Sequence, residues 1–365
     1  MKRPGRIFAA LCIVGAGALA FHIYRAKTRL PAAPVEAPAE APTPIPTQEP
    51  VPVVEPPVSA TASAAPVPEV PAQQAEPAPR RIFFRYNRVD SHYGKLAFVE
   101  PAHSLTPHFV EQFSCEVVYV SADRGICLSA DRGVFTTYAA TLFDAQSFAK
   151  LGEFSLAGIP SRARVSRNGK MAALTVFVTG HGYTSLDFST QTLLIDASTG
   201  RVIADLESFA VTRNGSPFKE TDFNFWGVTF TPDSKRFYAT LSSGGEHFLV
   251  EGDIEARTAR VIHSNVECPS LSPDGTRVAY KKRFKIDNRI VWQLHVLELE
   301  SGKETSLAEK RSVDDQLEWL DSSTVLYTVP ESEQSPSTNV WLAAADGSRK
   351  PRLYLRTAYS PAAVR

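Results

Sequence analysis

The chain has 365 residues, among them 39 basic and 39 acidic side chains. A balanced formal charge excludes the global electrostatic field that draws a protein to nucleic acid or to an anionic lipid surface, so we expect no nucleic-acid partner and a local binding site. The composition changes sharply along the chain and divides it into three regions, residues 1–30, 31–79 and 81–365.

The first region resembles an export signal. Residues 7–24 are apolar apart from His22, and basic residues stand on both sides of them. A basic stretch followed by an apolar one is typical of a secretory signal, and about 18 residues is near the lower limit for a membrane-spanning helix. Residues 18–20 (ALA) offer a cleavage site, which leaves cleavage open. We predict an uncleaved signal anchor, a single transmembrane helix with the rest of the chain on the extracytoplasmic side.

The second region cannot form a core. Residues 31–79 contain 15 of the 27 prolines and six glutamates, with no glycine, aromatic or basic residue. Such a composition is typical of a disordered, extended segment. At polyproline II spacing it reaches about 150 Å when fully extended. We therefore predict a Pro/Ala-rich disordered stalk that holds a domain away from the membrane.

The third region, residues 81–365, has the pattern of an all-β domain. Helical periodicity is nearly absent, and short apolar or alternating runs recur between turn signals. These runs are Lys95–Val99, Glu116–Val120, Met171–Val178, Thr192–Ile195, Phe237–Leu241, Arg277–Tyr280, Leu294–Leu297, Thr324–Thr328 and Asn339–Ala343.

The strands belong to a repeat. One hairpin recurs around the turn residues Asn168, Asp233, Asp274 and Asp321, whose side chains can start a tight turn. A second hairpin in each repeat gives four strands, the unit of a propeller blade. We predict a six-bladed β-propeller. Its blades are 109–159, 160–207, 225–264, 265–311 and 312–356, with an insertion at 208–224, and a sixth that joins 81–108 to a closing C-terminal strand at 359–364.

Several of these segments resemble a known family. The hairpin Leu271–Tyr280 (LSPDGTRVAY) is similar to the repeat of TolB-like, or WD40-like, six-bladed propellers. The same family is indicated by Asn224–Phe230 (NFWGVTF), Phe237–Leu241 (FYATL), Asn265–Thr276 (NVECPSLSPDGT), Ala279–Arg283 (AYKKR) and Arg311–Gln316 (RSVDDQ). The resemblance covers residues 81–365 and implies a bacterial cell-envelope protein whose propeller binds a partner. It implies no particular reaction.

Motifs of catalysis and cofactor binding are missing from the sequence. There is no Gly-x-Ser-x-Gly elbow, no Cys-x-x-Cys, no His-x-x-x-His and no phosphate-binding Gly-x-x-x-x-Gly-Lys-Ser/Thr loop. His103 and His108 lie five residues apart in an expected loop and are interpreted as solvated. We therefore expect no enzyme, no cofactor and no resident metal.

Polar residues gather just before the innermost strands, where a propeller's loops crowd around the mouth of its central channel. They are Arg162, Arg164, Asn224, Glu267, Asp314, Asp315 and Gln316. Charges of both signs would converge there on one concave region. The cluster is a candidate ligand or partner-binding site. Two alternatives stay open: a salt-bridge network that satisfies the strand ends, and a cation held by Glu267, Asp314 and Asp315.

The cysteines and the insertion also leave alternatives. Cys115 and Cys127 flank a short hairpin, so they form either a disulfide or two separate buried thiols; Cys268 has no evident partner. The insertion carries basic and aromatic residues, including Arg213, Lys219, Phe218 and Phe223, that form either a partner-binding rim or packing on their own blade. Trp226, Trp292, Trp319 and Trp341 are expected in the core or between blades.

Together these patterns favour a monomeric, membrane-anchored propeller in the bacterial cell envelope that binds an envelope protein or peptide without catalysis. The alternative is a hydrolase or lyase that acts on a peptide or carbohydrate through acidic residues near Asp314. A carboxylate at the channel mouth with a strongly raised pKa would favour the enzyme. A ring of satisfied ion pairs would favour the binding module.

Overall fold

The computed structural model describes residues 78–180, 188–332 and 334–365. The predicted anchor and nearly all of the predicted stalk lie outside the described residues. Within the described part, no helix is long and apolar enough to cross a membrane.

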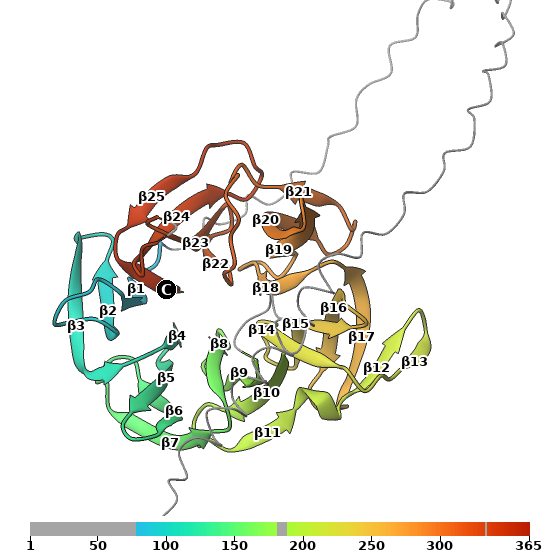
Figure 1. The fold of residues 1–365 in the computed structure, drawn as a ribbon, viewed down its shortest axis with the longest axis horizontal. Helices are drawn as coiled ribbons and strands as arrows, with labels where there is room; N and C mark the ends of the chain where they lie inside the picture. Colours follow the sequence, from blue (N-terminus) through green and yellow to red (C-terminus); the bar gives the residue numbers. More distant parts are fainter. Residues whose placement is uncertain (1–77, 181–187, 333) are drawn as a thin grey trace, which may run out of the picture. The chain divides into compact units, whose positions relative to one another are not determined.

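Six antiparallel sheets stand around a common axis, as Figure 1 shows. The closing sheet contains β26 (Ala358–Val364), β1 (Arg81–Tyr86), β2 (Lys95–Glu100) and β3 (Ser104–Ser114), and the next contains β4 (Val117–Ser121), β5 (Arg124–Arg132), β6 (Thr136–Asp144) and β7 (Lys150–Leu156). The third contains β8 (Ile159–Val165), β9 (Met171–Thr179), β10 (Ser189–Asp196) and β11 (Val202–Asp205). The fourth is built on β14 (Asn224–Phe230), β15 (Arg236–Ser243), β16 (Glu246–Asp253) and β17 (Thr258–Ser264). The fifth contains β18 (Glu267–Leu271), β19 (Arg277–Ile286), β20 (Arg289–Glu298) and β21 (Glu304–Ser306), and the sixth β22 (Glu318–Asp321), β23 (Thr324–Pro330), β24 (Thr338–Ala344) and β25 (Arg352–Leu355). The predicted six-bladed all-β fold is confirmed.

The C-terminal strand closes the ring, as predicted. β26 pairs antiparallel with β1, with Ile82 opposite Ala363, and it is the innermost strand of its sheet. One predicted boundary is wrong: the blade expected at 109–159 begins at β4, because β3 runs on to Ser114 and pairs with β2 in the closing sheet. Closure hides the innermost edges of the first and last blades from other chains.

The inner hairpins form as their turn residues predict. The Asp274 carboxylate accepts hydrogen bonds from the Ser272 hydroxyl and from the backbone N–H of Thr276 at 3.1 Å. Asn168, Asp233 and Asp321 each accept a backbone N–H from the residue two positions on, at 3.1, 3.1 and 2.7 Å. The side chain thus satisfies a turn donor that the strand ladder cannot reach.

The insertion changes one blade. After the 3₁₀ turn η1 (Leu206–Ser208), strand β12 (Ala210–Arg213) pairs in parallel with β17 and then with β13 (Ser216–Phe218). The fourth sheet therefore has six strands, and the prediction of four is wrong for this blade. The Phe218 ring lies 5.0 Å from that of Phe223 and 5.9 Å from that of Phe248. These aromatic side chains pack on their own blade.

Apolar side chains fill the space between neighbouring sheets. Trp226 and Trp319 are 0% and 2% exposed, and the Trp319 indole also donates to the Ser270 carbonyl of the preceding blade at 2.8 Å. Trp292 is buried and Trp341 packs against the same layer as Trp319. Each fully buried side chain of this size contributes roughly 1.5–3 kcal/mol. The expected core role of the four tryptophans is confirmed.

Cys115 and Cys127 are joined by a disulfide, with their Cα atoms 5.4 Å apart. It ties the segment before β4 to β5. Cys268 is a free, buried thiol in β18. Its backbone comes so close to Gly227 that a Cβ on Gly227 would meet the Cys268 Cα at 2.7 Å, and Gly227 also has φ +65°. Only glycine fits at this contact between two blades.

Candidate functional site at the mouth of the axis

Because the sheets are antiparallel, their inner strands all start at the same end of the axis, which we call the mouth. The sequence-derived site residues lie at or near this end, except Arg164, which comes close to the opposite end of its strand. Arg162 and Arg164 are in β8, Asn224 and Glu267 start β14 and β18, and Asp314, Asp315 and Gln316 immediately precede β22. The links between blades and the β5–β6, β15–β16 and β19–β20 turns lie at the mouth as well.

Four of the charged side chains form one ion-pair group, the mouth cluster, made of Arg162, Glu267, Lys281 and Asp314. The Lys281 ammonium lies 3.6 Å from Glu267 Oε2 and hydrogen-bonds to the Asp314 carboxylate. Arg162 Nη2 lies 3.5 Å from Asp314 Oδ1. Lys281 is missing from the sequence-derived site, although it is the charge that joins Glu267 to Asp314.

Glu267 is fully buried, and the fold supplies it with several donors. The Trp292 indole donates to its Oε1 at 3.0 Å, and Arg283 Nε and His247 Nδ1 lie 3.7 and 3.9 Å away. Lys281 is also fully buried, with its ammonium 4.5 Å from the centre of the Trp292 ring. Burial by itself would lower the pKa of Lys281, but the carboxylates, Asp314 foremost, raise it overall. Lys281 is therefore a cation at neutral pH.

The neighbouring carboxylates of Asp314 and Asp315 differ in access. Asp314 has 41% of its side-chain surface exposed. Partial burial by itself would raise the pKa of Asp314, but the positive charges of Lys281 and Arg162 lower it overall. Asp315 is 4% exposed and accepts hydrogen bonds from the Thr328 hydroxyl and from the backbone N–H groups of Thr328 and Gln316, both at 2.8 Å. Burial raises the pKa of Asp315. Of the two, only Asp314 presents its carboxylate at the surface.

Arg164 belongs to a second group, the axial plug, with Tyr119 and Glu318. Its guanidinium donates to Glu318 Oε2 at 2.5 Å and to the Leu317 carbonyl at 3.0 Å, and it lies 4.5 Å above the Tyr119 ring. The Tyr119 hydroxyl donates to the same Glu318 oxygen at 2.9 Å, and burial raises the pKa of Tyr119 to about 12. Because β8 and β22 stand on opposite sides of the ring, this ion pair crosses the axis.

The plug leaves little room along the axis. The cavities around Arg164 have volumes of about 30 and 20 Å³. A cavity of that size holds only one or two water molecules. The ring in Figure 1 has an open centre between its ribbons, but these side chains fill it. These cavities around Arg164 are therefore too small to admit a ligand.

Gln316 and Asn224 have structural partners. The Gln316 amide donates to the carbonyls of Val228 and Pro269, both at 3.2 Å, and so ties the start of β22 to two other blades. Asn224 Oδ1 accepts the backbone N–H of Thr190 at 2.8 Å. Asn224 lies at a blade junction, and within the described part of the chain its hydrogen bonds go to Thr190 and Asp222.

A groove of about 630 Å³ adjoins the cluster. Its walls include Arg283, Phe284 and Lys285 from β19, and His247 from β16. The Asn265 side chain accepts from the N–H of Arg283 at 3.0 Å and donates to its carbonyl at 2.9 Å, which fixes this part of β19. Arg283 Nη1 lies 3.2 Å from His247 Nε2, and burial lowers the pKa of that imidazole. The groove is not part of the predicted site, although its lining residue Asn265 stands two positions before Glu267.

No group of three His, Cys, Asp or Glu side chains that could hold a metal is found among the described residues. The ammonium of Lys281 stands between Glu267 and Asp314, where a bound metal cation was one of the open alternatives.

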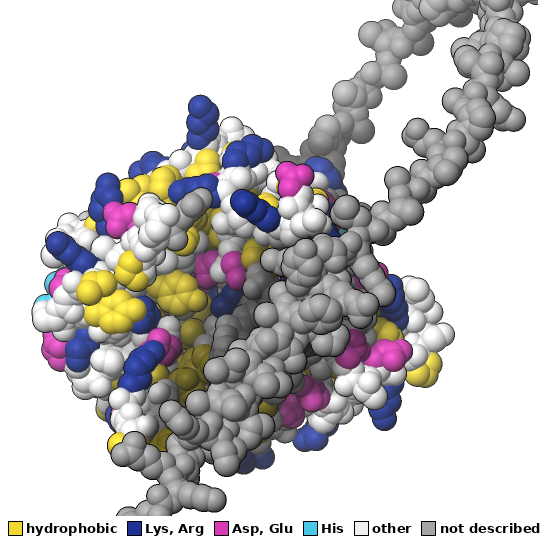
Figure 2. Space-filling model, in the orientation of Figure 1, with side chains coloured by type: hydrophobic (Ala, Val, Ile, Leu, Met, Phe, Trp, Pro, Cys, Tyr) yellow, Lys and Arg dark blue, Asp and Glu magenta, His cyan; other side chains and the backbone are white. Residues whose placement is uncertain are grey.

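Figure 2 shows one face of the molecule on which acidic and basic side chains meet near the axis.

No protein-family model and no curated protein matches this chain. Among solved structures it is similar to TolB from Acinetobacter baumannii, with a TM-score of 0.53 and 18% identity over 78% of this chain and 67% of that one. It is also similar to a putative TolB from Agrobacterium tumefaciens (TM-score 0.44, 12% identity, 76% of this chain and 89% of that one) and to an oligogalacturonate lyase in complex with manganese (0.43, 14%, 76% and 74%). At these identities the likeness shows the fold alone, which is that of a TolB-like propeller.

Proposed function

We propose that the chain is a non-catalytic interaction module whose mouth binds an envelope protein or peptide. The observation that carries the proposal is the position of Asp314, a carboxylate with 41% of its side-chain surface exposed that is held between the cations of Lys281 and Arg162. A partner's cationic group can pair with it without first ordering a flexible side chain, and such preorganisation lowers the entropic cost of binding.

The groove gives the same partner a second contact. Phe284 offers partly buried apolar surface, and Lys285 is exposed at its edge. Interfaces combine apolar anchors with a charged rim. A peptide that places a basic residue over Asp314 and an apolar one over Phe284 matches both features.

The alternative function is a hydrolase or lyase acting on a peptide or carbohydrate. Its supporting observation is the raised pKa of Asp315, since a carboxyl group with a raised pKa can act as a general acid. Asp315 is 4% exposed, however, and its oxygens accept three hydrogen bonds from the protein. The contacts of Asp315 fit a structural link better than a proton donor to substrate.

We further propose that the propeller is monomeric and is held on the extracytoplasmic side of a bacterial cytoplasmic membrane by the single N-terminal anchor and stalk. The disulfide between Cys115 and Cys127 supports this location, because disulfides persist in oxidising compartments.

Chemical crosslinking of the tagged full-length chain in its native cells, followed by mass spectrometry, tests the binding function. The informative variant is Asp314→Asn, since Glu267 and Asp315 are buried and their loss would disturb the fold. Asp346→Asn, an exposed aspartate at the opposite end of the blades, is the matched control. We expect one defined protein or peptide to be captured by the normal chain and the control and lost in Asp314→Asn. Equal capture by all three would overturn the proposed site.

A further inference from the structure

A second pocket lies at the opposite end of the blades from the mouth, where β1 starts and β26 ends. It has a volume of about 550 Å³ and is lined from three turns, with His103 after β2, Ala122 after β4 and Gln146 after β6. The closing sheet and its neighbour thus form its two sides. None of its lining residues belongs to the mouth cluster, the axial plug or the groove.

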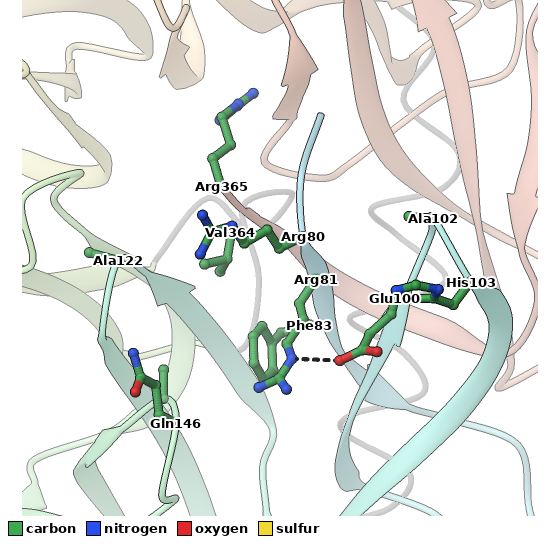
Figure 3. Close-up of a pocket in the computed structure, with 11 residues that line it drawn as sticks. Arg80, Arg81, Phe83, Glu100, Ala102, His103, Ala122, Gln146, Val364 and Arg365 are labelled. Carbon is green, nitrogen blue, oxygen red and sulfur yellow. Dashed lines mark hydrogen bonds and ion pairs between the residues drawn. The ribbon is translucent and has the colours of Figure 1, made fainter. Parts of the chain in front are cut away.

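Basic side chains dominate the charged lining of this seam pocket. Arg80, Arg81 and Arg365 line it, and Glu100 is the one acidic side chain among its lining residues. Figure 3 shows Arg81 between Gln146 and Glu100 and Arg80 beside Val364 on the side of Ala122, whereas the guanidinium of Arg365 points away. Two neighbouring residues of one strand end therefore bring two guanidinium groups to the same cavity.

The two arginines differ in how they are held. Arg81 Nε donates to Glu100 Oε1 at 3.0 Å and its guanidinium lies 4.6 Å above the Phe98 ring, so its position is fixed. Arg80 is exposed and makes no ion pair within the described part of the chain; only its backbone N–H is fixed, by the Val364 carbonyl at 2.7 Å. Arg80 is therefore available to an anion, and Arg81 adds positive potential behind it.

The remaining lining is apolar and small. Ala102, Ala122, Ala145 and Val364 contribute small apolar walls, and Phe83 also lines the cavity but is only 1% exposed. A site that combines a few polar groups with apolar walls in a volume of several hundred cubic ångströms has the general character of a small-molecule site. Small side chains admit a flat or branched apolar group beside the guanidinium groups.

We propose that the seam pocket binds a small ligand that carries an oxyanion, a carboxylate or a phosphate, on an apolar body. The oxyanion pairs with Arg80 next to Arg81, and the apolar body lies against Ala102, Ala122 and Val364. A guanidinium group can donate two parallel hydrogen bonds to either a carboxylate or a phosphate, so the site can bind either kind of ligand in the same way. This site is separate from the partner-binding mouth, so a ligand can occupy it without displacing a bound partner.

Isothermal titration of the full-length chain with four probes tests the proposal. The probes are phenyl phosphate, benzoate, inorganic phosphate and benzyl alcohol, and each is also titrated into Arg80→Gln. We expect phenyl phosphate or benzoate to bind, and the one that binds more tightly identifies the preferred oxyanion. Its binding should weaken at least about tenfold in Arg80→Gln. Arg201→Gln, another exposed arginine at the same end of the blades, removes the same charge and should bind as the normal chain does.

The changes in backbone amide chemical shifts, measured by NMR, show where the probe binds. The amides of Ala102, Ala122 and Gln146 should move on titration of the tighter probe and stay unmoved in Arg80→Gln. The proposal is overturned if neither aromatic anion binds, or if Arg80→Gln and Arg201→Gln bind equally well. Equal affinity for inorganic phosphate and phenyl phosphate would also overturn it, because the apolar walls would then contribute nothing to binding. Equal affinity for benzyl alcohol and phenyl phosphate would overturn it too, because the guanidinium groups would then contribute nothing.

Discussion

The mouth cluster and the axial plug are both built around ion pairs and differ in their access to water. In the plug, the Arg164 and Glu318 side chains are 6% and 8% exposed, and their partners come from across the ring. In the mouth cluster, Lys281 and Glu267 are fully buried, but Asp314 is 41% exposed. One group closes the axis; the other holds a carboxylate in place at the surface.

The difference shows how a propeller can separate stability from recognition along one axis. A buried ion pair gains little net stability over an apolar pair, but removing one partner leaves a costly uncompensated charge. A half-exposed charge loses less of its hydration and keeps its capacity to pair with another molecule. We therefore expect changes in the plug to act on folding and changes at Asp314 to act on binding.

The largest effect is expected from Glu318→Gln, which leaves the buried Arg164 guanidinium without its carboxylate. The free energy of unfolding should fall by about 3–5 kcal/mol, measured by urea denaturation. The double variant Arg164→Met, Glu318→Leu removes both charges and should recover most of the loss. A loss below about 1 kcal/mol in Glu318→Gln would show that the plug is not a stability element.

A somewhat smaller loss, about 2–4 kcal/mol, is expected from Lys281→Met, because Glu267 then remains buried with its remaining neighbours Trp292, Arg283 and His247. Lys303→Met is the control: Lys303 is exposed and pairs with the surface residue Glu298, so its loss should stay within about 0.5 kcal/mol. Equal losses in the two variants would remove the distinction between buried and exposed pairs.

The smallest effect concerns the pH dependence of stability at Asp314. Its pKa in the folded chain lies below the ordinary 3.8, so its contribution is present above that pH and is lost as the pH falls through the folded value. The difference in unfolding free energy between the normal chain and Asp314→Asn should be at most about 1 kcal/mol from pH 5 to 7 and should close below about pH 3.8. If the difference in unfolding free energy between the two chains grew as the pH fell, the ion pairs of Asp314 would be contradicted.

The fold was predictable because the signals that specify it are local. Alternating strands and the turn residues at Asn168, Asp233, Asp274 and Asp321 determine each hairpin without reference to the rest of the chain. Strand β12 was missed because its pairing with β17 is parallel and distant in sequence, and β13 joins the sheet only through its hairpin with β12. The length of β3 was misjudged for a similar reason: its pairing with β2 continues past irregular positions.

The site was only partly predictable, because its geometry depends on a bulge. In β18, Leu271 pairs with Val278, and an unbroken ladder would place Lys282 opposite Glu267. The register shift between Glu267 and Ser270 brings Lys281 there instead and creates the buried ion pair. The sequence wrongly places Arg164 at the mouth, because nothing local identifies its partner. That partner, Glu318, lies across the ring and 154 positions along the chain.

The central claim is that the mouth is the surface that meets a partner. The most direct measurement is site-specific photo-crosslinking in native cells, with a photoreactive residue at exposed Lys285 in the groove, compared with one at exposed Thr199 in the turn between β10 and β11 at the opposite end of the blades. The account predicts one defined crosslinked species from position 285 that disappears when Asp314→Asn is added, and none from position 199. The same species from both positions, or a species from 285 that persists with Asp314→Asn, would contradict it.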